Sequence, residues 1–261
     1  MPAEPAHAQQ YPTASSVEEF ARNLAAVRAR IDAAAERAGR SPADVRLLPV
    51  SKTVPEERLR NAIAAGMRQL GENKVQEAKR KHANLIDTGV AWSVIGHLQT
   101  NKARDVAAFA AEFQALDSLR VAEALDRRLQ AAGRSLDVFV QVNTSAEESK
   151  YGLPPDEVPA FLRRLPAYTA LNVQGLMTLA VFSSDLDRVR ACFARLRTLR
   201  DRVRDTDAAF VGPGELSMGM SGDFEVAVAE GATCLRVGQA IFGARAANED
   251  HYWPSDAHPA G

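Results

Sequence analysis

The sequence contains only two cysteines, Cys192 and Cys234, among its 261 residues. Two cysteines cannot build a disulfide framework, and together with the five histidines they show no metal-ligand spacing. We therefore expect no disulfide scaffold and no metal site. No apolar run reaches the roughly 18 residues of a membrane span, and the N-terminus lacks the basic start and apolar stretch of a signal peptide. These absences predict a soluble, cytoplasmic protein with no membrane partner.

Neither sign of charge is in excess, because 33 acidic side chains oppose 32 basic ones and the formal net charge is -1. A nearly neutral chain has no bulk attraction for nucleic acid, so we expect no nucleic-acid partner. Lysine is scarce, since six of the 32 basic residues are lysine and the other 26 are arginine. A lysine at an apolar position is therefore a candidate for chemistry in this chain.

Neither a low-complexity linker nor a short repeat divides the chain, so we predict a single domain over residues 16–245. Residues 1–15 are predicted to be a disordered tail, and residues 246–261 a C-terminal tail. The domain is expected to begin with a helix, because Ser16 and Glu19 form a capping-box pattern and apolar side chains then recur at helical spacing.

Short apolar runs recur along the rest of the chain, and most gaps between them have a helical pattern. Eight strand candidates separated by helices predict an α/β protein with a single (β/α)8 TIM barrel, preceded by the extra N-terminal helix. A doubly wound open sheet is the alternative, and in either fold the chemistry is expected where the parallel strands end. The strand candidates are Val45–Val50, Met67–Gly71, Trp92–Gly96, Phe113–Leu116, Val138–Val142, Val173–Met177, Leu216–Met220 and Leu235–Val237.

The first strand candidate leads into Lys52, and strand alternation puts Leu48, Val50 and Lys52 on one face. If that face is the barrel interior, Lys52 emerges at the rim from an apolar wall. Desolvation there disfavours the ammonium form, which frees the amine to attack an aldehyde. The alternative is a solvated lysine at the entrance of the next helix.

The last two strand candidates end in loops that suit a phosphate group. After the seventh, Ser221 and Gly222 precede a helical stretch, where backbone N–H groups and a positive dipole end favour an anion. Asp223 is interpreted as the N-cap of that helix. On the eighth, Arg236 and Gly238 share a face, and the glycine allows close backbone approach at the rim. Phosphate sites after strands seven and eight recur in this type of barrel.

A phosphate cradle, an amine on the first strand and an inward arginine on the eighth together match pyridoxal 5'-phosphate (PLP) bound as a Schiff base. Lys52 would form the covalent aldimine, and Arg236 would face the pyridine nitrogen. Arginine cannot accept a proton from that nitrogen, so the nitrogen stays unprotonated and the ring is a weaker electron sink.

These residues lie in blocks that resemble the pyridoxal phosphate homeostasis protein family, in family order from about residue 17 to residue 245. The resemblance implies a barrel like the N-terminal domain of alanine racemase. The site residues that it implies are Lys52 as the aldimine lysine, Arg236 at the ring nitrogen, Asn73 beside the cofactor, Met218 in the pocket wall, and Ser221, Gly222, Gly238 and Gln239 around the phosphate. The matching blocks are Val50–Thr53, Gly71–Glu77, Ile95–Lys102, Gln141–Asn143, Gly175–Thr178, Ser217–Ser221 and Arg236–Gly243.

The length of the chain bears on its activity, because only 16 residues follow Arg245. Alanine racemase has a second domain whose tyrosine, from the partner subunit, is the opposite-face base, and racemisation needs groups on both faces. We therefore expect a PLP carrier and regulator in vitamin B6 and amino-acid homeostasis, without efficient catalysis and without catalytic residues. It is expected to be a monomer, with PLP-requiring apo-enzymes as candidate partners. The alternatives are a PLP-dependent amino-acid racemase or related small enzyme, and a cofactor-free barrel aldolase.

Three further features are given structural interpretations. Lys150, after the fifth strand candidate, is interpreted as a flexible surface lysine rather than a second cofactor-handling amine. His97, after the third, is interpreted as a hydrogen-bonded loop histidine with no carboxylate partner identified. The basic run 79–82 is interpreted as a solvated helix face.

Overall fold

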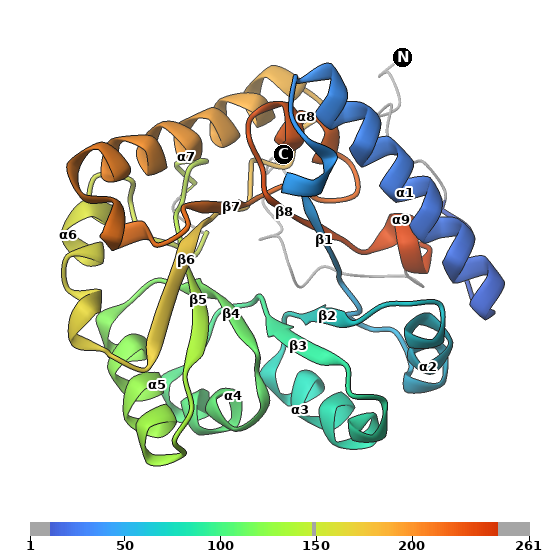
Figure 1. The fold of residues 1–261 in the computed structure, drawn as a ribbon, viewed down its shortest axis with the longest axis horizontal. Coiled ribbons are helices and arrows are strands. Elements are labelled where there is room, and N and C mark those ends of the chain that lie inside the picture. The colour runs from blue at the N-terminus through green and yellow to red at the C-terminus, as the bar shows by residue number, and fades with distance from the viewer. Residues whose placement is uncertain (1–10, 148–149, 245–261) are drawn as a thin grey trace, which may run out of the picture.

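The computed structural model describes residues 11–147 and 150–244, and the account of the fold concerns those residues. Within them, eight parallel strands form a single sheet in the order β1-β8-β7-β6-β5-β4-β3-β2, which curls into a barrel (Figure 1). The predicted (β/α)8 barrel is confirmed, and each strand candidate coincides with a strand to within a few residues. The strands are β1 (Arg46–Pro49), β2 (Gln69–Glu72), β3 (Ala91–Val94), β4 (Glu112–Leu116), β5 (Leu136–Gln141), β6 (Leu171–Met177), β7 (Glu215–Ser217) and β8 (Cys234–Val237).

The barrel closes at β1, which lies between β8 and β2. β1 and β8 pair along their whole length, with Leu48 opposite Arg236. Where β1 ends, the Val50 N–H donates to the Val237 carbonyl at 2.9 Å, and the Ser51 N–H donates to the Gly71 carbonyl at 2.9 Å. A parallel bridge also pairs Val50 with Gly71. Because the first strand is bonded to both the eighth and the second, the open-sheet alternative is wrong.

Helices surround the barrel (Figure 1). They form where apolar side chains recur every three to four residues, so that each helix buries one stripe; in α7 the stripe includes Val189, Phe193 and Leu196. The α-helices are α1 (Val17–Arg37), α2 (Glu56–Ala64), α3 (Val75–Asn84), α4 (Ala103–Phe109), α5 (Leu119–Ala131), α6 (Val158–Leu162), α7 (Leu186–Asp207), α8 (Phe224–Ala229) and α9 (Gln239–Phe242). Short 3-10 helices span Pro42–Asp44, Ile86–Thr88, Thr100–Lys102, Leu165–Ala167 and Ala208–Val211.

The extra N-terminal helix α1 packs against α8 and α9. Its capping box forms as predicted: the Ser16 hydroxyl accepts from the Glu19 N–H, and the Glu19 carboxylate accepts from the Ser16 N–H. Phe20 is fully buried, and its ring meets that of Phe242 edge-on with centroids 5.6 Å apart. α1 therefore covers, from outside, the helix that follows the last strand.

The segment before α1 is also attached to the barrel. The Ala14 N–H donates to the Phe242 carbonyl at 3.4 Å. Arg58 of α2 ties the two together, because its guanidinium donates to the carbonyls of both residues. Residues 1–10 of the predicted N-terminal tail and the whole predicted C-terminal tail, 246–261, lie outside the described residues, as does residue 245.

A row of polar side chains runs through the barrel interior. At the floor, the Arg46 guanidinium pairs with the buried Glu112 carboxylate. Gln114 donates to Glu112 at 2.6 Å and accepts from the Ser217 hydroxyl at 2.7 Å. Ser217 accepts in turn from Arg236 Nη1 at 2.6 Å. We call Glu112, Gln114, Ser217 and Arg236 the interior chain; because every member has a partner, this row can stay polar at little cost.

Replacing Phe20 by alanine is expected to lower the free energy of unfolding by about 3–5 kcal/mol, because it empties a fully buried aromatic site. Urea unfolding followed by circular dichroism measures this. Arg22→Ala, on the exposed face of the same helix, is the matched control and should change stability by no more than about 0.5 kcal/mol. Equal effects of the two substitutions would contradict the packing described for α1.

Candidate functional site

Lys52 lies two residues beyond Val50, at the carboxyl end of β1. The face predicted to carry it points into the barrel, because Leu48 pairs in register with Arg236, which belongs to the interior chain, and the Leu48 and Val50 side chains both lie 3.4 Å from a Cβ placed on Gly71 of β2. Leu48 and Val50 are buried, whereas Lys52 is half-buried. Lys52 therefore leaves an apolar wall where the barrel begins to open, as the alternation pattern predicts.

The loop after β7 is bonded to α9, the short helix that directly follows β8. The Ser221 hydroxyl accepts from the Ala240 N–H at 3.3 Å. A Cβ on Gly238 would lie 3.1 Å from the Val50 carbonyl, so the end of β8 also packs closely on the end of β1. The ends of β1, β7 and β8, which carry Lys52, Ser221 and Gly238, thus form one continuous rim.

Gly222 borders open space at this rim. A Cβ built on it would meet no atom within 4 Å, and the residue is exposed. Among the described residues, the backbone N–H groups of Ser221 and Gly222 have no hydrogen-bond acceptor. This part of the rim therefore offers backbone donors to a ligand at a place where no side chain intrudes.

Asp223 is the N-cap residue of α8, as predicted, but its side chain makes no capping hydrogen bond. Its carboxylate turns back and accepts from the Met220 N–H at 2.6 Å. Burial raises the pKa of Asp223, while that N–H and the charge of Arg236 oppose the rise. The carboxylate thus fixes the β7 loop upstream of Ser221.

Arg236 points into the barrel from β8 and is only 3% exposed. Its Nη1 donates to Ser217, and its Nη2 donates to the Thr178 carbonyl at 2.7 Å. These bonds come from two neighbouring strand ends, so the plane of the guanidinium is fixed. The site therefore contains a permanent, oriented positive charge.

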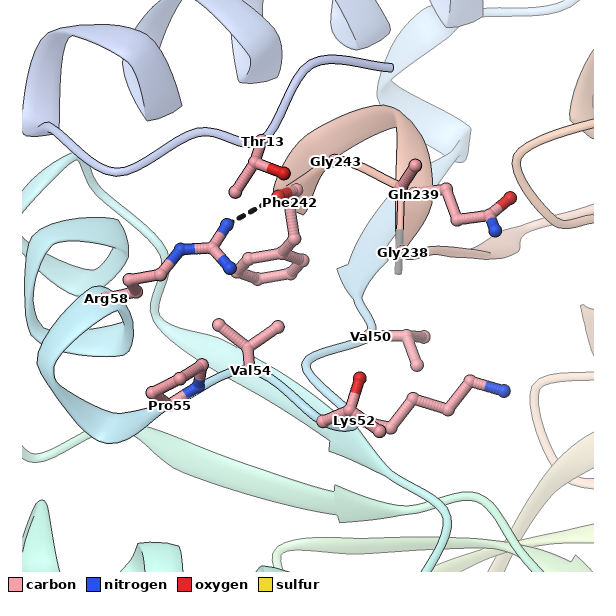
Figure 2. Close-up of a pocket in the computed structure, with 12 residues that line it drawn as sticks. Thr13, Val50, Lys52, Val54, Pro55, Arg58, Gly238, Gln239, Phe242 and Gly243 are labelled. Carbon is pink, nitrogen blue, oxygen red and sulfur yellow. Dashed lines mark hydrogen bonds between the residues drawn. The ribbon is translucent and has the colours of Figure 1, made fainter. Parts of the chain in front are cut away.

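A pocket of about 260 Å³ adjoins the rim. Of the predicted site residues, it brings together Lys52, Gly238 and Gln239. Figure 2 shows that Lys52 and Gln239 extend their polar ends to the same side, away from Arg58 and Phe242 at the other end of the pocket. The pocket is thus bounded by the stem of Lys52, whose amine lies on the same side as the Gln239 carboxamide.

The remaining predicted site residues lie apart from this pocket. Asn73 follows β2 and is half-buried. Its carbonyl packs against Gly96 so closely that a Cβ on Gly96 would lie 2.1 Å away. Met218 has no exposed surface, and its N–H donates to the Cys234 carbonyl. The structure does not bring Met218 to the open surface of the rim.

The expectation of a solvated helix face is wrong for Lys81, whose side chain is 0% exposed. Its ammonium contacts Glu72 Oε1 at 2.7 Å, Glu77 Oε1 at 2.7 Å and the Ser51 carbonyl at 2.8 Å. We call Lys81, Glu72, Glu77 and Ser51 the Lys81 cluster. Burial raises the pKa of Glu72 and the charge of Lys81 opposes that rise.

Helical spacing could have located Lys81. It lies three residues after Ala78, which is buried on the inner stripe of α3, and four residues after Glu77. Residues at these spacings share one helix face. A lysine on the buried face of a helix, with a glutamate one turn before it, indicates a buried ion pair. This signal was overlooked because Lys81 also belongs to the basic run 79–82.

His97 has a carboxylate neighbour that the sequence alone did not identify. Its Nδ1 lies 3.5 Å from an oxygen of Asp117, which follows β4. The imidazole also stacks on the Tyr151 ring, with centroids 4.0 Å apart. Burial raises the pKa of Asp117, and the nearby His97 opposes the rise. Only the folded barrel brings these three loops together.

Lys150 is not a surface lysine, so that part of its interpretation is wrong. Its side chain is 9% exposed, pairs with Glu147 and donates to the Ala180 carbonyl at 3.0 Å. It therefore links the loops after β5 and β6. In the described part of the chain, no group of three or more acidic, histidine or cysteine side chains could hold a metal ion.

Comparison with known proteins places the chain in a family. Residues 22–246 match the family model described as the alanine racemase N-terminal domain. A relative from Pseudomonas aeruginosa, named pyridoxal phosphate homeostasis protein, is 43% identical over 226 residues, which cover 87% of this chain and 96% of the relative. The chain belongs to the pyridoxal phosphate homeostasis protein family. The predicted resemblance is thereby confirmed.

Two solved structures agree with this membership in the pyridoxal phosphate homeostasis protein family. PipY of Synechococcus elongatus, solved with PLP bound, is 37% identical with a TM-score of 0.75, and the match covers 86% of this chain and all of that one. A protein of unknown function from Bifidobacterium adolescentis is 34% identical with a TM-score of 0.80, over 90% of this chain and 99% of that one. Within the described residues, no helix has the length and apolarity to cross a membrane.

Replacing Gly96 by alanine is expected to displace the Asn73 loop and to destabilise the protein by about 1–3 kcal/mol, because the new Cβ overlaps a backbone carbonyl. Gly222→Ala is the matched control, since its Cβ enters open space. Thermal unfolding of the two variants without added ligand measures the difference. Equal melting temperatures would contradict the prediction, because they would show that the Asn73 loop moves away from the new Cβ at no measurable cost.

Proposed function

We propose that the protein binds PLP as a Schiff base on Lys52 and acts in PLP homeostasis. The observation that carries the proposal is the continuous rim, which joins Lys52 to the loops bearing Ser221 and Gly238. The amine attacks the aldehyde carbon of PLP, a C=N bond forms, and the aldehyde oxygen leaves as water, so nothing is oxidised or reduced. The PLP-bound Synechococcus relative supports this choice of ligand.

The side chains and backbone of the site are compatible with such a ligand. The open space at Gly222 and the N–H groups of Ser221 and Gly222 suit a phosphate, with Gly238 and Gln239 on the adjoining loop. Asn73 would approach the bound ring from the β2 loop, and Met218 would support the loop from below. PLP, when bound, supplies an aldehyde and an electron-withdrawing ring.

Arg236 would meet the ring nitrogen in this proposal. Its guanidinium is held by Ser217 and Thr178, and it has no lone pair with which to accept a proton. The nitrogen would therefore stay unprotonated, which weakens stabilisation of a substrate carbanion. This supports a carrier that passes PLP to PLP-requiring apo-enzymes over an efficient racemase, in line with relatives named for homeostasis.

Adding PLP to the purified protein is expected to produce the visible absorption band of a Schiff base. Lys52→Ala should abolish the band, because the amine that forms the C=N bond is gone. Lys150→Ala is the matched lysine control and should keep it. Absorption spectra recorded during titration with PLP measure both effects.

Each other outcome of this titration has a distinct meaning. A wild-type protein that forms no band would contradict the Schiff-base proposal and revive a cofactor-free aldolase. A band that survives in Lys52→Ala but disappears in Lys150→Ala would move the anchor to Lys150. Sustained racemisation of single amino acids by the loaded protein would overturn the carrier proposal and leave PLP binding intact.

Gly222→Ala is expected to weaken PLP binding about tenfold, the equivalent of about 1.4 kcal/mol, because its Cβ would occupy the phosphate space. Binding of pyridoxal, which lacks the phosphate, should be unchanged. Titrations of both ligands against wild type and variant test this. If the substitution weakened both equally, the phosphate would have to lie elsewhere.

A further inference from the structure

The Lys81 cluster lies behind Lys52, on the outer side of the barrel wall. Val50 faces inward, so strand alternation turns Ser51 outward toward α3. There the Ser51 hydroxyl donates to Glu72 Oε1 at 2.7 Å, and both side chains are fully buried. The cluster therefore contacts the chain next to Lys52 without entering the ligand side of the wall.

The cluster holds the peptide groups on both sides of Lys52. Before it, the Ser51 carbonyl accepts from Lys81 Nζ at 2.8 Å. After it, the Thr53 N–H donates to Glu77 Oε1 at 3.0 Å. Glu77 is itself held by Lys81 at 2.7 Å, so both contacts depend on the same ammonium group.

The backbone next to Lys52 needs such support. Thr53 has a φ of +66°, which is unfavourable for a β-branched side chain and persists only where the surroundings fix it. Among the described residues, the only other non-glycine residue with a positive φ is Ala146. The bond from Thr53 to Glu77 is made in that strained conformation.

Lys81 is also the only charge that compensates Glu72 within the cluster. Removing one partner of a buried ion pair leaves the other charge uncompensated, and the pair then rearranges or changes protonation. Glu72 and Glu77 share Lys81, so loss of its ammonium releases both carboxylates together. Removing the Lys81 ammonium is therefore expected to weaken the hydrogen bonds to the Ser51 carbonyl and from the Thr53 N–H together.

We propose that Lys81 is a positioning residue for Lys52, acting through Ser51 and through Glu77 and Thr53. It fixes the backbone from which the Lys52 side chain projects, and it does not touch the ligand. This inference rests on the proposed role of Lys52 as the PLP anchor.

The test compares four variants with the wild-type protein at a temperature where circular dichroism shows all of them folded. Lys81→Met removes the ammonium with little change of shape. Glu77→Ala removes the acceptor for Thr53, whereas Glu77→Gln keeps an amide oxygen there. Glu230→Gln is the matched control, because it disrupts the ion pairs of another buried carboxylate, which lies at the C-terminal end of α8 and pairs with Arg190 and Arg197 of α7.

Two quantities are measured on each variant. Hydrogen exchange of the Thr53 amide, without PLP, reports the hold on the backbone. The rate and affinity of Schiff-base formation with PLP report the reactivity of Lys52. Lys81→Met should speed exchange and weaken binding by about tenfold each, the equivalent of losing one hydrogen bond. Glu77→Ala should do the same, Glu77→Gln should stay near wild type, and Glu230→Gln should lower only the melting temperature.

Wild-type exchange and binding in Lys81→Met would overturn the inference, whatever its melting temperature. If Lys81→Met does not fold, Glu77→Ala is compared with Glu77→Gln instead. Equal Thr53 exchange and equal Schiff-base formation in those two variants would overturn the inference. A wild-type protein that forms no Schiff base defeats the proposed function instead. The exchange of Thr53 would then still show whether Lys81 holds the backbone.

Discussion

The two backbone hydrogen bonds at the end of β1 are the contacts on which the rest of the site depends. They tie Val50 to β8 and Ser51 to β2, and so they close the barrel. Closure sends the next residue, Lys52, out at the rim and sets Ser51 against α3 on the other side. It also places the β8 loop, and through Ser221 the β7 loop, beside the amine. A shift of one residue in this pairing would exchange the two faces of β1.

Charged groups are buried on both sides of the barrel wall. Inside, Arg46 and Glu112 form the floor, and outside, Lys81 lies between Glu72 and Glu77. Buried ion pairs contribute little net stability compared with apolar packing, but they tolerate few alternative arrangements. In this protein one pair lies at the floor of the interior chain that positions the Arg236 guanidinium, and the other lies behind Lys52, the proposed anchor of PLP.

The sequence predicted the barrel well because its strands are short apolar runs that local pattern can detect. It also predicted the position of Lys52, since that position follows from alternation along β1. Asp117 was missed because its proximity to His97 depends on the folding of two separate loops. Lys81 was wrongly predicted to be exposed, because the prediction used the charge of the basic run and not the position of Lys81 on the buried face of the helix. At Asp223, a cap pattern was correct in position, but the carboxylate binds upstream at Met220.

The interior chain has a direction. Arg236 donates to Ser217, Ser217 donates to Gln114, and Gln114 donates to Glu112. Every hydrogen points toward the floor, and the uppermost member has no lone pair with which to take up another. A proton arriving at the mouth therefore has no acceptor at the top of the interior chain. The interior chain therefore couples Arg236 electrostatically to Glu112, but it does not pass protons from a group bound at the rim to the Glu112 carboxylate.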